Sequence, residues 1–282
     1  DHSAPLAPGL YIVSTPIGNL GDISLRALAT LARADMVFCE DTRHSRKLLS
    51  HFGIARETHS YHDHNAAKER PRILARLRAG QSVAIISDAG TPLVSDPGNK
   101  LVREAREAGL SVFAVPGASA ALAALASAGL PADRFFFEGF LPPKTVARKK
   151  RLQALESIPA TLVFYEAPSR LEAALADLEG VLGSRDGAVA KELTKLHEGL
   201  VRGSLPDLAA TAADTLAAQA PPAPLVAPPR AEAVDDQAIE SALERAFADE
   251  TSLRDAVDAA TQALGVPRKR VYRLALALQD KE

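Results

Sequence analysis

A continuous apolar run in the first half of the chain passes directly into a turn-rich loop, and residues 82–93 read SVAIISDAGTPL. The apolar run Val83–Ile86 is typical of a strand buried on both faces of a parallel sheet. The loop that follows, from Ser87 to Gly98, contains two glycines and two prolines. Glycine lets a backbone approach a ligand closely, and proline holds a loop rigid. These features predict a parallel sheet with a ligand-binding loop at the carboxyl end of this strand.

Strand and helix signals alternate on both sides of this run. Short apolar runs at residues 10–13, 36–39 and 112–115 are separated by segments with helical spacing. Strands that alternate with helices imply parallel βαβ units, so the fold class is α/β. A second region repeats the pattern, with strands expected at 134–138 and 161–165. We therefore predict two α/β domains, residues 1–117 and 118–220.

The sequence changes character after residue 220. Five prolines fall within the nine residues from Pro221 to Pro229, which we interpret as excluding a helix or a central strand and as marking a linker over 221–234. Residues 235–282 form a small helical C-terminal extension in this interpretation. Its last helix is basic, with Arg268, Lys269, Arg270 and Arg273. Its final two helices resemble a helix-turn-helix, or else a helical hairpin packed on the body of the protein.

Composition excludes several classes of protein. The chain has 282 residues, 47% of them hydrophobic and 24% charged, which is typical of a soluble globular protein rather than a disordered one. Its one cysteine, Cys39, excludes an intramolecular disulfide and a multi-cysteine zinc module and fits a reducing compartment. The sequence has neither an apolar run of 18 residues nor a signal-peptide pattern. We therefore expect a cytoplasmic protein that makes no contact with a membrane.

The net charge of −2 hides two blocks of opposite sign. Residues 61–151 contain 14 Lys or Arg against 8 Asp or Glu, whereas residues 207–264 contain 3 against 11. The basic block includes the run Arg148–Arg151. A basic patch attracts the phosphates of nucleic acid, although a solvated helix face is the simpler interpretation of one such run. The net charge therefore does not exclude an RNA partner.

Gly/Pro-rich or polar loops follow four of the expected strands, and a fifth polar segment, Tyr61–Asn65, precedes a helix. Open α/β sheets bind ligands at the carboxyl ends of their strands, so we expect a ligand-binding cleft there. Neither the Gly-x-Gly-x-x-Gly turn of dinucleotide-binding domains nor a Walker-type phosphate loop occurs. These absences disfavour a nicotinamide enzyme and a Walker-type nucleotide hydrolase. A ligand of the cleft would be held mainly by backbone and shape.

Taken in order, the motifs between residues 10 and 205 resemble the tetrapyrrole-methylase superfamily, and most closely its ribosomal branch, which methylates the 2'-oxygen of a cytidine in 16S rRNA. The motifs are Thr15–Leu20, Glu40–Arg43, His64–Asn65, Ser87–Gly98, Pro116–Ala120, Phe164–Arg170 and Lys191–Lys195. The resemblance implies a dimeric two-domain enzyme with S-adenosylmethionine in the interdomain cleft. It implies the decoding region of the small ribosomal subunit as substrate.

The resemblance also implies site residues. The cofactor is expected against Gly18, Asp88, Ala89, Gly90, Thr91, Pro92, Leu93, Val94, Pro116, Ser119, Ala120 and Tyr165. The chain departs from the family pattern after Leu205, where an apolar strand normally completes the second domain. Here the segment is rich in Ala and Pro, and Leu225 and Val226 are the only remnant of that strand.

A ribose hydroxyl is a poor nucleophile until its proton leaves, so a nearby proton acceptor would help the transfer. The candidates at strand ends are Glu40, Asp41, His62, His64 and Asp88, of which we prefer Asp41 and His64 as catalytic residues. Asp41 could instead hold its loop, and His64 could instead orient a neighbour at a helix start.

The residues expected to face RNA are Arg43, Asn65, Lys144, Arg148, Lys149, Lys150, Arg151, Lys191 and Lys195. No metal is expected, because the His-x-His pair at 62 and 64 lacks convincing third and fourth ligands. Two other functions remain open: a methyltransferase of the same superfamily acting on a tetrapyrrole or another small molecule, and a non-catalytic RNA-binding assembly protein.

Overall fold

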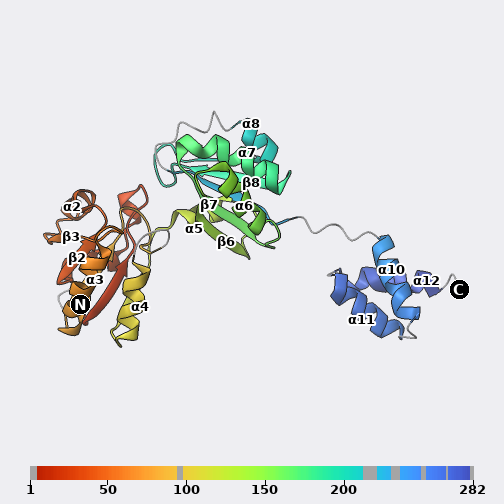
Figure 1. Cartoon of the computed structure of the whole chain (residues 1–282), viewed down its shortest axis with the longest axis horizontal. Coiled ribbons are helices and arrows are strands. Elements are labelled where there is room, and N and C mark those ends of the chain that lie inside the picture. The colour runs from red at the N-terminus through yellow and green to blue at the C-terminus, as the bar shows by residue number, and fades with distance from the viewer. Residues whose placement is uncertain are drawn as a thin grey trace. The chain divides into compact units, whose positions relative to one another are not determined.

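The computed structural model describes residues 5–93, 98–211, 221–229, 236–248, 252–264 and 266–279. The chain divides into two compact units, Asp1–Pro229 and Arg230–Glu282. In the described residues, the first unit contains two five-stranded sheets, and the second contains helices (Figure 1).

The first sheet is parallel throughout, with strand order β3-β2-β4-β1-β5. Its strands are β1 Gly9–Val13, β2 Met36–Cys39, β3 Thr58–Ser60, β4 Ser82–Ile86 and β5 Val112–Val115. Every residue of β1 and β4 is buried, which confirms the prediction from the apolar run. The helices of this region are α1 Leu25–Arg33, α2 Thr42–His51, α3 Ala66–Arg78 and α4 Asn99–Glu107, with a 3-10 turn at Leu20–Asp22.

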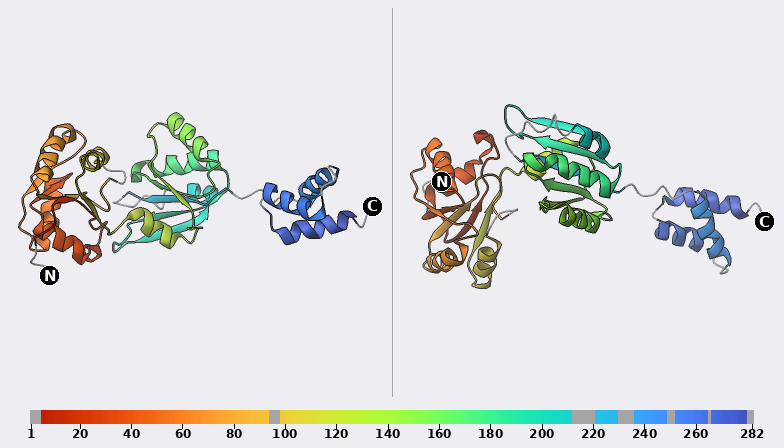
Figure 2. Two further views of the ribbon diagram at one scale, coloured as in Figure 1. Left: turned by 90° about the horizontal axis from the view of Figure 1, so that it is seen from below. Right: turned by 45° about the horizontal axis from the view of Figure 1, so that its top comes forward.

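Helices cover both faces of this sheet (Figure 2). On one face, Ile73 and Leu77 of α3 and Leu101 of α4 pack against alternate residues of the strands. On the other face, Leu31 of α1 and Leu49 of α2 do the same. Because both faces are buried, the strands read as continuous apolar runs rather than as alternating ones.

The second sheet is mixed, with strand order β6-β7-β10-β8-β9. Its strands are β6 Phe135–Phe140, β7 Thr161–Tyr165, β8 Asp186–Lys191, β9 Gly199–Ser204 and β10 Ala223–Val226. The helices are α5 Ala120–Ala128, α6 Thr145–Leu155, α7 Leu171–Leu182 and α8 Leu205–Ala210, with a 3-10 turn at Pro168–Arg170. Helix α5 packs on one face, and α6, α7 and α8 pack on the other. The fold class of two α/β domains is confirmed.

The linker predicted over 221–234 is wrong for its first part, because β10 is the central strand of the second sheet. The backbone N–H of Ala227 donates to Asp186 O in β8, at 2.8 Å. Successive residues of a strand direct their N–H groups to opposite sides, so the nitrogen of Pro224 is directed toward β7. Pairing with β7 begins only at Leu225. The missing N–H of Pro224 therefore interrupts the sheet on one side only, and the family's last strand is present.

Among the described residues of the second unit there are three helices, α10 Asp236–Ala248, α11 Leu253–Leu264 and α12 Arg268–Gln279. They share a core of their own, which includes Leu243, Val257 and Val271. Arg268 and Arg270 of the basic helix pair with Asp258 and Asp236. The predicted helical extension is therefore an independent packing unit, while the predicted boundary between residues 117 and 118 stays a prediction.

Candidate active site

The carboxyl ends of β1 and β4 are joined by a two-residue backbone bridge. The N–H of Thr15 donates to Gly90 O at 2.9 Å, and the N–H of Gly90 donates back to Thr15 O at 3.1 Å. Beside it, the hydroxyls of Ser14 and Thr91 are hydrogen-bonded at 2.9 Å. Gly90 has φ +83°, a conformation that L side chains rarely adopt. The bridge fixes the predicted cofactor loop against the end of β1.

One pocket of about 390 Å³ lies on the Thr91 side of this bridge, and we call it the Pro116 pocket. It includes three residues predicted to bind the cofactor, Thr91, Pro116 and Ser119, and its walls include Phe135 and Phe137 of β6. Its other lining residues are Ile12, Ser14, Ala114, Val115, Gly117, Ala121 and Leu122. The pocket is largely apolar, with hydroxyls at one part of its wall.

The loop after β5 has a glycine, Gly117, where its backbone passes close to Ser14. A Cβ placed on Gly117 would lie 2.9 Å from Cβ of Ser14, closer than real side chains approach. Tyr165, a predicted cofactor residue, anchors the start of α5, because its hydroxyl accepts a hydrogen bond from the N–H of Ala121 at 3.0 Å. Ala120 is the first residue of that helix. Tyr165 therefore holds a wall of the Pro116 pocket but is not part of its lining.

A second pocket of about 720 Å³ is lined by the rest of the first loop and by α2, and we call it the α2 pocket. It includes Gly18, Asp88 and Ala89 of the predicted cofactor set and Lys195 of the predicted RNA set. It also includes His44, Lys47 and His51, which the sequence analysis did not select. Their spacing of three and four residues places them on one face of a helix, and that spacing is the signal that could have found them.

The loop after β4 carries backbone strain. Leu93 has φ +75°, which is uncommon for a residue with a Cβ. Residues in such strained conformations are found more often at functional sites. Pro92 next to it is buried, and a Cβ on Gly98 would meet the Leu93 side chain. Val94, also predicted to bind the cofactor, lies outside the described residues.

Carboxyl groups gather where β2 ends. Asp41 caps α2, and its side chain accepts a hydrogen bond from the N–H of Arg43 at 2.7 Å. This bond lowers the pKa of Asp41 below the usual range and weakens the carboxylate as a base. The N–H of Asp41 donates to Asp88 Oδ1 at 3.2 Å. Burial raises the pKa of Glu40, and the negative charges of Asp88 and Asp63 raise it further.

His64 is exposed, and its ring meets the ring of His62 edge to face, with centroids 5.9 Å apart. Asn65 organises this turn, because its Oδ1 accepts from the N–H of His62 at 2.9 Å and its Nδ2 donates to Ser60 O at 3.0 Å. The amide of Asn65 is thus engaged within the turn rather than presented to a ligand.

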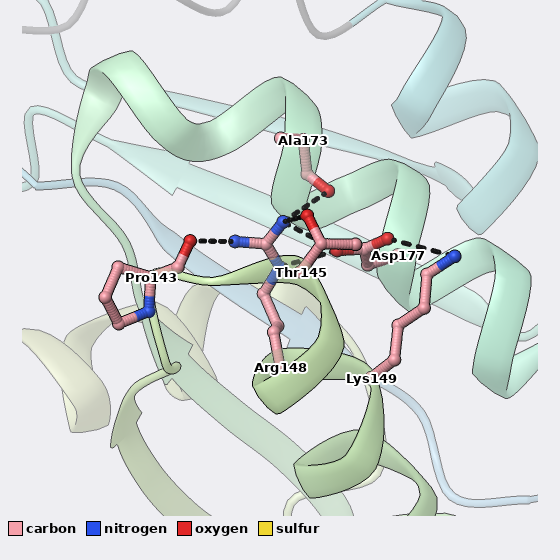
Figure 3. A network of polar contacts seen from close by, with 6 residues as sticks. All are labelled: Pro143, Thr145, Arg148, Lys149, Ala173 and Asp177. Carbon is pink, nitrogen blue, oxygen red and sulfur yellow. Dashed lines mark hydrogen bonds and ion pairs between the residues drawn. The ribbon is translucent and has the colours of Figure 1, made fainter.

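Arg148 is not available to RNA, and this prediction was wrong. Its side chain is 2% exposed and forms an ion pair with Asp177, at 2.6 Å from Nη2 to Oδ2. It also donates to the carbonyl oxygens of Pro143 and Ala173 (Figure 3). Positions 148, 152 and 155 share the face of α6 that packs against α7, so the charge at 148 is buried with the leucines.

The other cations of this run are exposed. Lys144, Lys149 and Lys150 reach solvent, with Lys149 Nζ 3.4 Å from Asp177 Oδ1. Arg151 makes a two-pronged contact with the Glu138 carboxylate. Arg43 is exposed at the start of α2, and Lys191 is half-buried at the end of β8. Across the described ranges, no three His, Cys, Asp or Glu side chains gather as a metal site requires, and no helix there is long and apolar enough to cross a membrane.

Comparison with known proteins places the chain in a family. Residues 9–209 match the family described as Tetrapyrrole (Corrin/Porphyrin) Methylases. The chain belongs to this family. Residues 233–279 match a second family, described as the RsmI C-terminal HTH domain.

Two of the relatives have the same name. A Mesorhizobium japonicum protein named Ribosomal RNA small subunit methyltransferase I is 50% identical over 279 residues, which cover 98% of this chain and 94% of the relative. A Pseudomonas aeruginosa protein of the same name is 54% identical over 190 residues, which cover 67% of each chain.

Solved structures share the fold of this family member. A diphthine synthase has a TM-score of 0.61 at 18% identity, and the match covers 77% of this chain and 89% of that one. A uroporphyrin-III C-methyltransferase from Thermus thermophilus, solved in complex with S-adenosyl homocysteine, has a TM-score of 0.54 at 20% identity. That match covers 78% of this chain and 97% of the other. At these identities the likeness speaks for the fold alone.

Proposed function

We propose that the protein is an S-adenosylmethionine-dependent methyltransferase of 16S rRNA that methylates the 2'-oxygen of a cytidine in the decoding region. The observation that supports this most directly is the pair of pockets beside the Thr15–Gly90 bridge, one apolar and one lined by cationic side chains. A cofactor and a nucleotide that react with each other need such neighbouring sites. The name of the Mesorhizobium japonicum relative, whose match covers 98% of this chain, supports small-subunit ribosomal RNA as the class of substrate.

The Pro116 pocket fits the cofactor chemically. Its aromatic and aliphatic walls suit a purine ring, and the hydroxyls of Ser14 and Thr91 suit polar groups of the same molecule. When bound, S-adenosylmethionine supplies an electrophilic methyl carbon. The residues of the pocket would hold the cofactor and exclude water, so that the acceptor oxygen and the methyl carbon can be aligned.

We assign the role of proton acceptor to Glu40. Asp41 was the preferred carboxylate, but it caps α2 and its pKa is lowered, so we propose that it positions its loop. Glu40 directly follows β2 and precedes Asp41, whose N–H donates to the Asp88 carboxylate of the α2 pocket, and its raised pKa favours proton uptake from a hydroxyl. His64 stays a second candidate, because it is exposed beside His62 in the neighbouring loop.

A homodimer in the cytoplasm is the proposed form of the enzyme. Strand β6 is an edge strand that leaves Phe140 46% exposed, outside the lining of both pockets. Large exposed apolar side chains on an edge strand support an interface with a second copy. The single buried thiol of Cys39 suits a reducing compartment.

The experiment supplies methyl-labelled S-adenosylmethionine with free 16S rRNA, with small subunits from cells that lack this methylation, or with a tetrapyrrole. Mapping then locates the label, because a 2'-O-methyl group blocks alkaline cleavage at that nucleotide. Label at one cytidine of the decoding region is expected. Label in the tetrapyrrole would indicate a small-molecule methyltransferase, and binding to subunits without label would indicate an assembly protein.

A further inference from the structure

The α2 pocket gathers basic side chains that the cofactor does not require. Helix α2 reads TRHSRKLLSH over residues 42–51 and contains no acidic residue. His44, Lys47 and His51 of this helix line the pocket. Within the part of the chain that the structure describes, Lys47 has no carboxylate within ion-pair distance. Its charge therefore remains available to an anion.

The loop after β8 of the second sheet contributes a second lysine to the lining of the α2 pocket. Lys195 follows β8 and lies against the first loop, where a Cβ on Gly18 would approach its Cγ to 2.6 Å. The absence of a side chain at residue 18 thus makes room for Lys195. Its ammonium pairs with Glu192 at 3.0 Å and is 31% exposed.

The turn that carries Lys195 is held in an unusual conformation. Glu192 and Thr194 have φ of +49° and +65°, a region that residues with a Cβ rarely occupy. The N–H of Thr194 donates to the Glu198 carboxylate at 2.7 Å, which fastens the turn. Strained turns persist where the surrounding structure fixes them and are common at ligand sites.

Asp88 is the acidic residue among those that line this pocket, and the N–H of Asp41 already donates to its carboxylate. Lys195 already pairs with Glu192, so Lys47 is the lysine of this pocket that has no carboxylate within ion-pair distance among the described residues. An unpaired ammonium beside a partly satisfied carboxylate favours an anionic ligand of the size of a phosphate group.

We propose that the α2 pocket binds the phosphodiester on the 3' side of the methylated nucleotide, with Lys47 as its main contact. The inference rests on the proposed function. In a ribonucleotide, the 2'-oxygen and the 3'-phosphate are carried by adjacent carbons of the ribose. A site that presents the 2'-oxygen to a cofactor in the Pro116 pocket must therefore accommodate that phosphate next to it. Thr15 lines the α2 pocket, and its chain neighbour Ser14 lines the Pro116 pocket together with Thr91, which follows Gly90, so the two pockets lie on either side of the Thr15–Gly90 bridge. The α2 pocket supplies the charge.

The test compares Lys47→Ala, Lys47→Arg and the matched control Arg46→Ala. Arg46 is exposed on the same helix and is absent from the pocket lining, so its removal changes the net charge equally. For Lys47→Ala we expect KM for under-methylated small subunits to rise about tenfold. We expect the plot of log affinity against log salt concentration to become less steep, by the contribution of roughly one phosphate contact. Lys47→Arg should restore most of the affinity, and cofactor affinity measured by calorimetry should stay unchanged.

Equal effects of Lys47→Ala and Arg46→Ala would overturn the proposal, because they would show a general charge effect. A loss of cofactor affinity in Lys47→Ala, with subunit binding unchanged, would also overturn it and assign the pocket to the cofactor. If the wild-type protein labels neither free 16S rRNA nor subunits, the proposed function fails. If it does label subunits and Lys47→Ala behaves as wild type, only the phosphate site fails.

Discussion

Replacing Asp177 by Ala leaves the guanidinium of Arg148 buried without its counter-charge. The wild-type carboxylate accepts hydrogen bonds from Arg148 Nε at 2.7 Å and forms the ion pair with Nη2 at 2.6 Å. Both side chains are almost fully buried, at 2% and 8% exposed. The guanidinium would keep neutral acceptors, namely Pro143 O at 3.3 Å and Ala173 O and Thr145 Oγ1 at 3.4 Å (Figure 3).

Breaking a buried ion pair by removing one partner costs about 3–5 kcal/mol. Because three neutral acceptors remain, we place the loss of unfolding free energy for Asp177→Ala near the lower end, at about 3 kcal/mol. For a region of this size, that loss lowers Tm by roughly 6–12 °C. Replacing the pair by apolar residues, Arg148→Met with Asp177→Leu, removes the uncompensated charge, so the double variant should regain most of the loss.

Thermal unfolding followed by circular dichroism measures the effect, with urea unfolding as a second measurement. The matched control is Lys149→Ala, because Lys149 contacts the same carboxylate from the surface, at 3.4 Å, and exposed pairs contribute about 0–1 kcal/mol. A loss below about 1 kcal/mol in Asp177→Ala would refute the reasoning. A double variant less stable than Asp177→Ala would do so as well.

Three further predictions concern the site and the assembly. The proton acceptor must be deprotonated, and the pKa of Glu40 is raised, so the wild-type rate should fall as pH drops through a midpoint above the ordinary carboxyl range. Glu40→Gln should flatten this low-pH limb of the rate profile. An unchanged profile would remove Glu40 from this role. Gly90→Ala places a Cβ on a residue with φ +83°, and this Cβ would lie 3.3 Å from Ile17 Cγ2. The substitution should lower the free energy of unfolding by about 1–2 kcal/mol and weaken cofactor binding measured by calorimetry. Wild-type values for both would contradict the role of the bridge. Phe140→Ser should shift the protein toward monomer in sedimentation, whereas an unaltered dimer would place the interface elsewhere.

The first sheet was predictable because its strands are buried on both faces and therefore appear as uninterrupted apolar runs. Strand β10 was not, because proline density is normally incompatible with a central strand. Only the alternation of N–H directions shows that Pro224 loses a hydrogen bond on one side alone, and that depends on the neighbouring strands. The short strand β3 has too few residues to give a pattern.

The candidate site was predictable where backbone geometry decides it. The loops of Gly90 and Pro116 meet at one end of the sheet because parallel strands bring their carboxyl ends together. The charged residues of the site were harder to predict from the sequence. Arg148 was counted with its basic neighbours, although its spacing of four and seven residues from Leu152 and Leu155 marks it as an inward position. Lys47 lies outside the block from residue 61 that the charge count selected, and its role depends on the approach of Lys195.

The most direct measurement is the position of the methyl group after reaction of the purified protein with labelled S-adenosylmethionine and under-methylated small subunits. The proposed function predicts label on the ribose of a single cytidine in the decoding region, resistant to alkaline cleavage. Label on a base, at a different nucleotide, or in no RNA at all would contradict it.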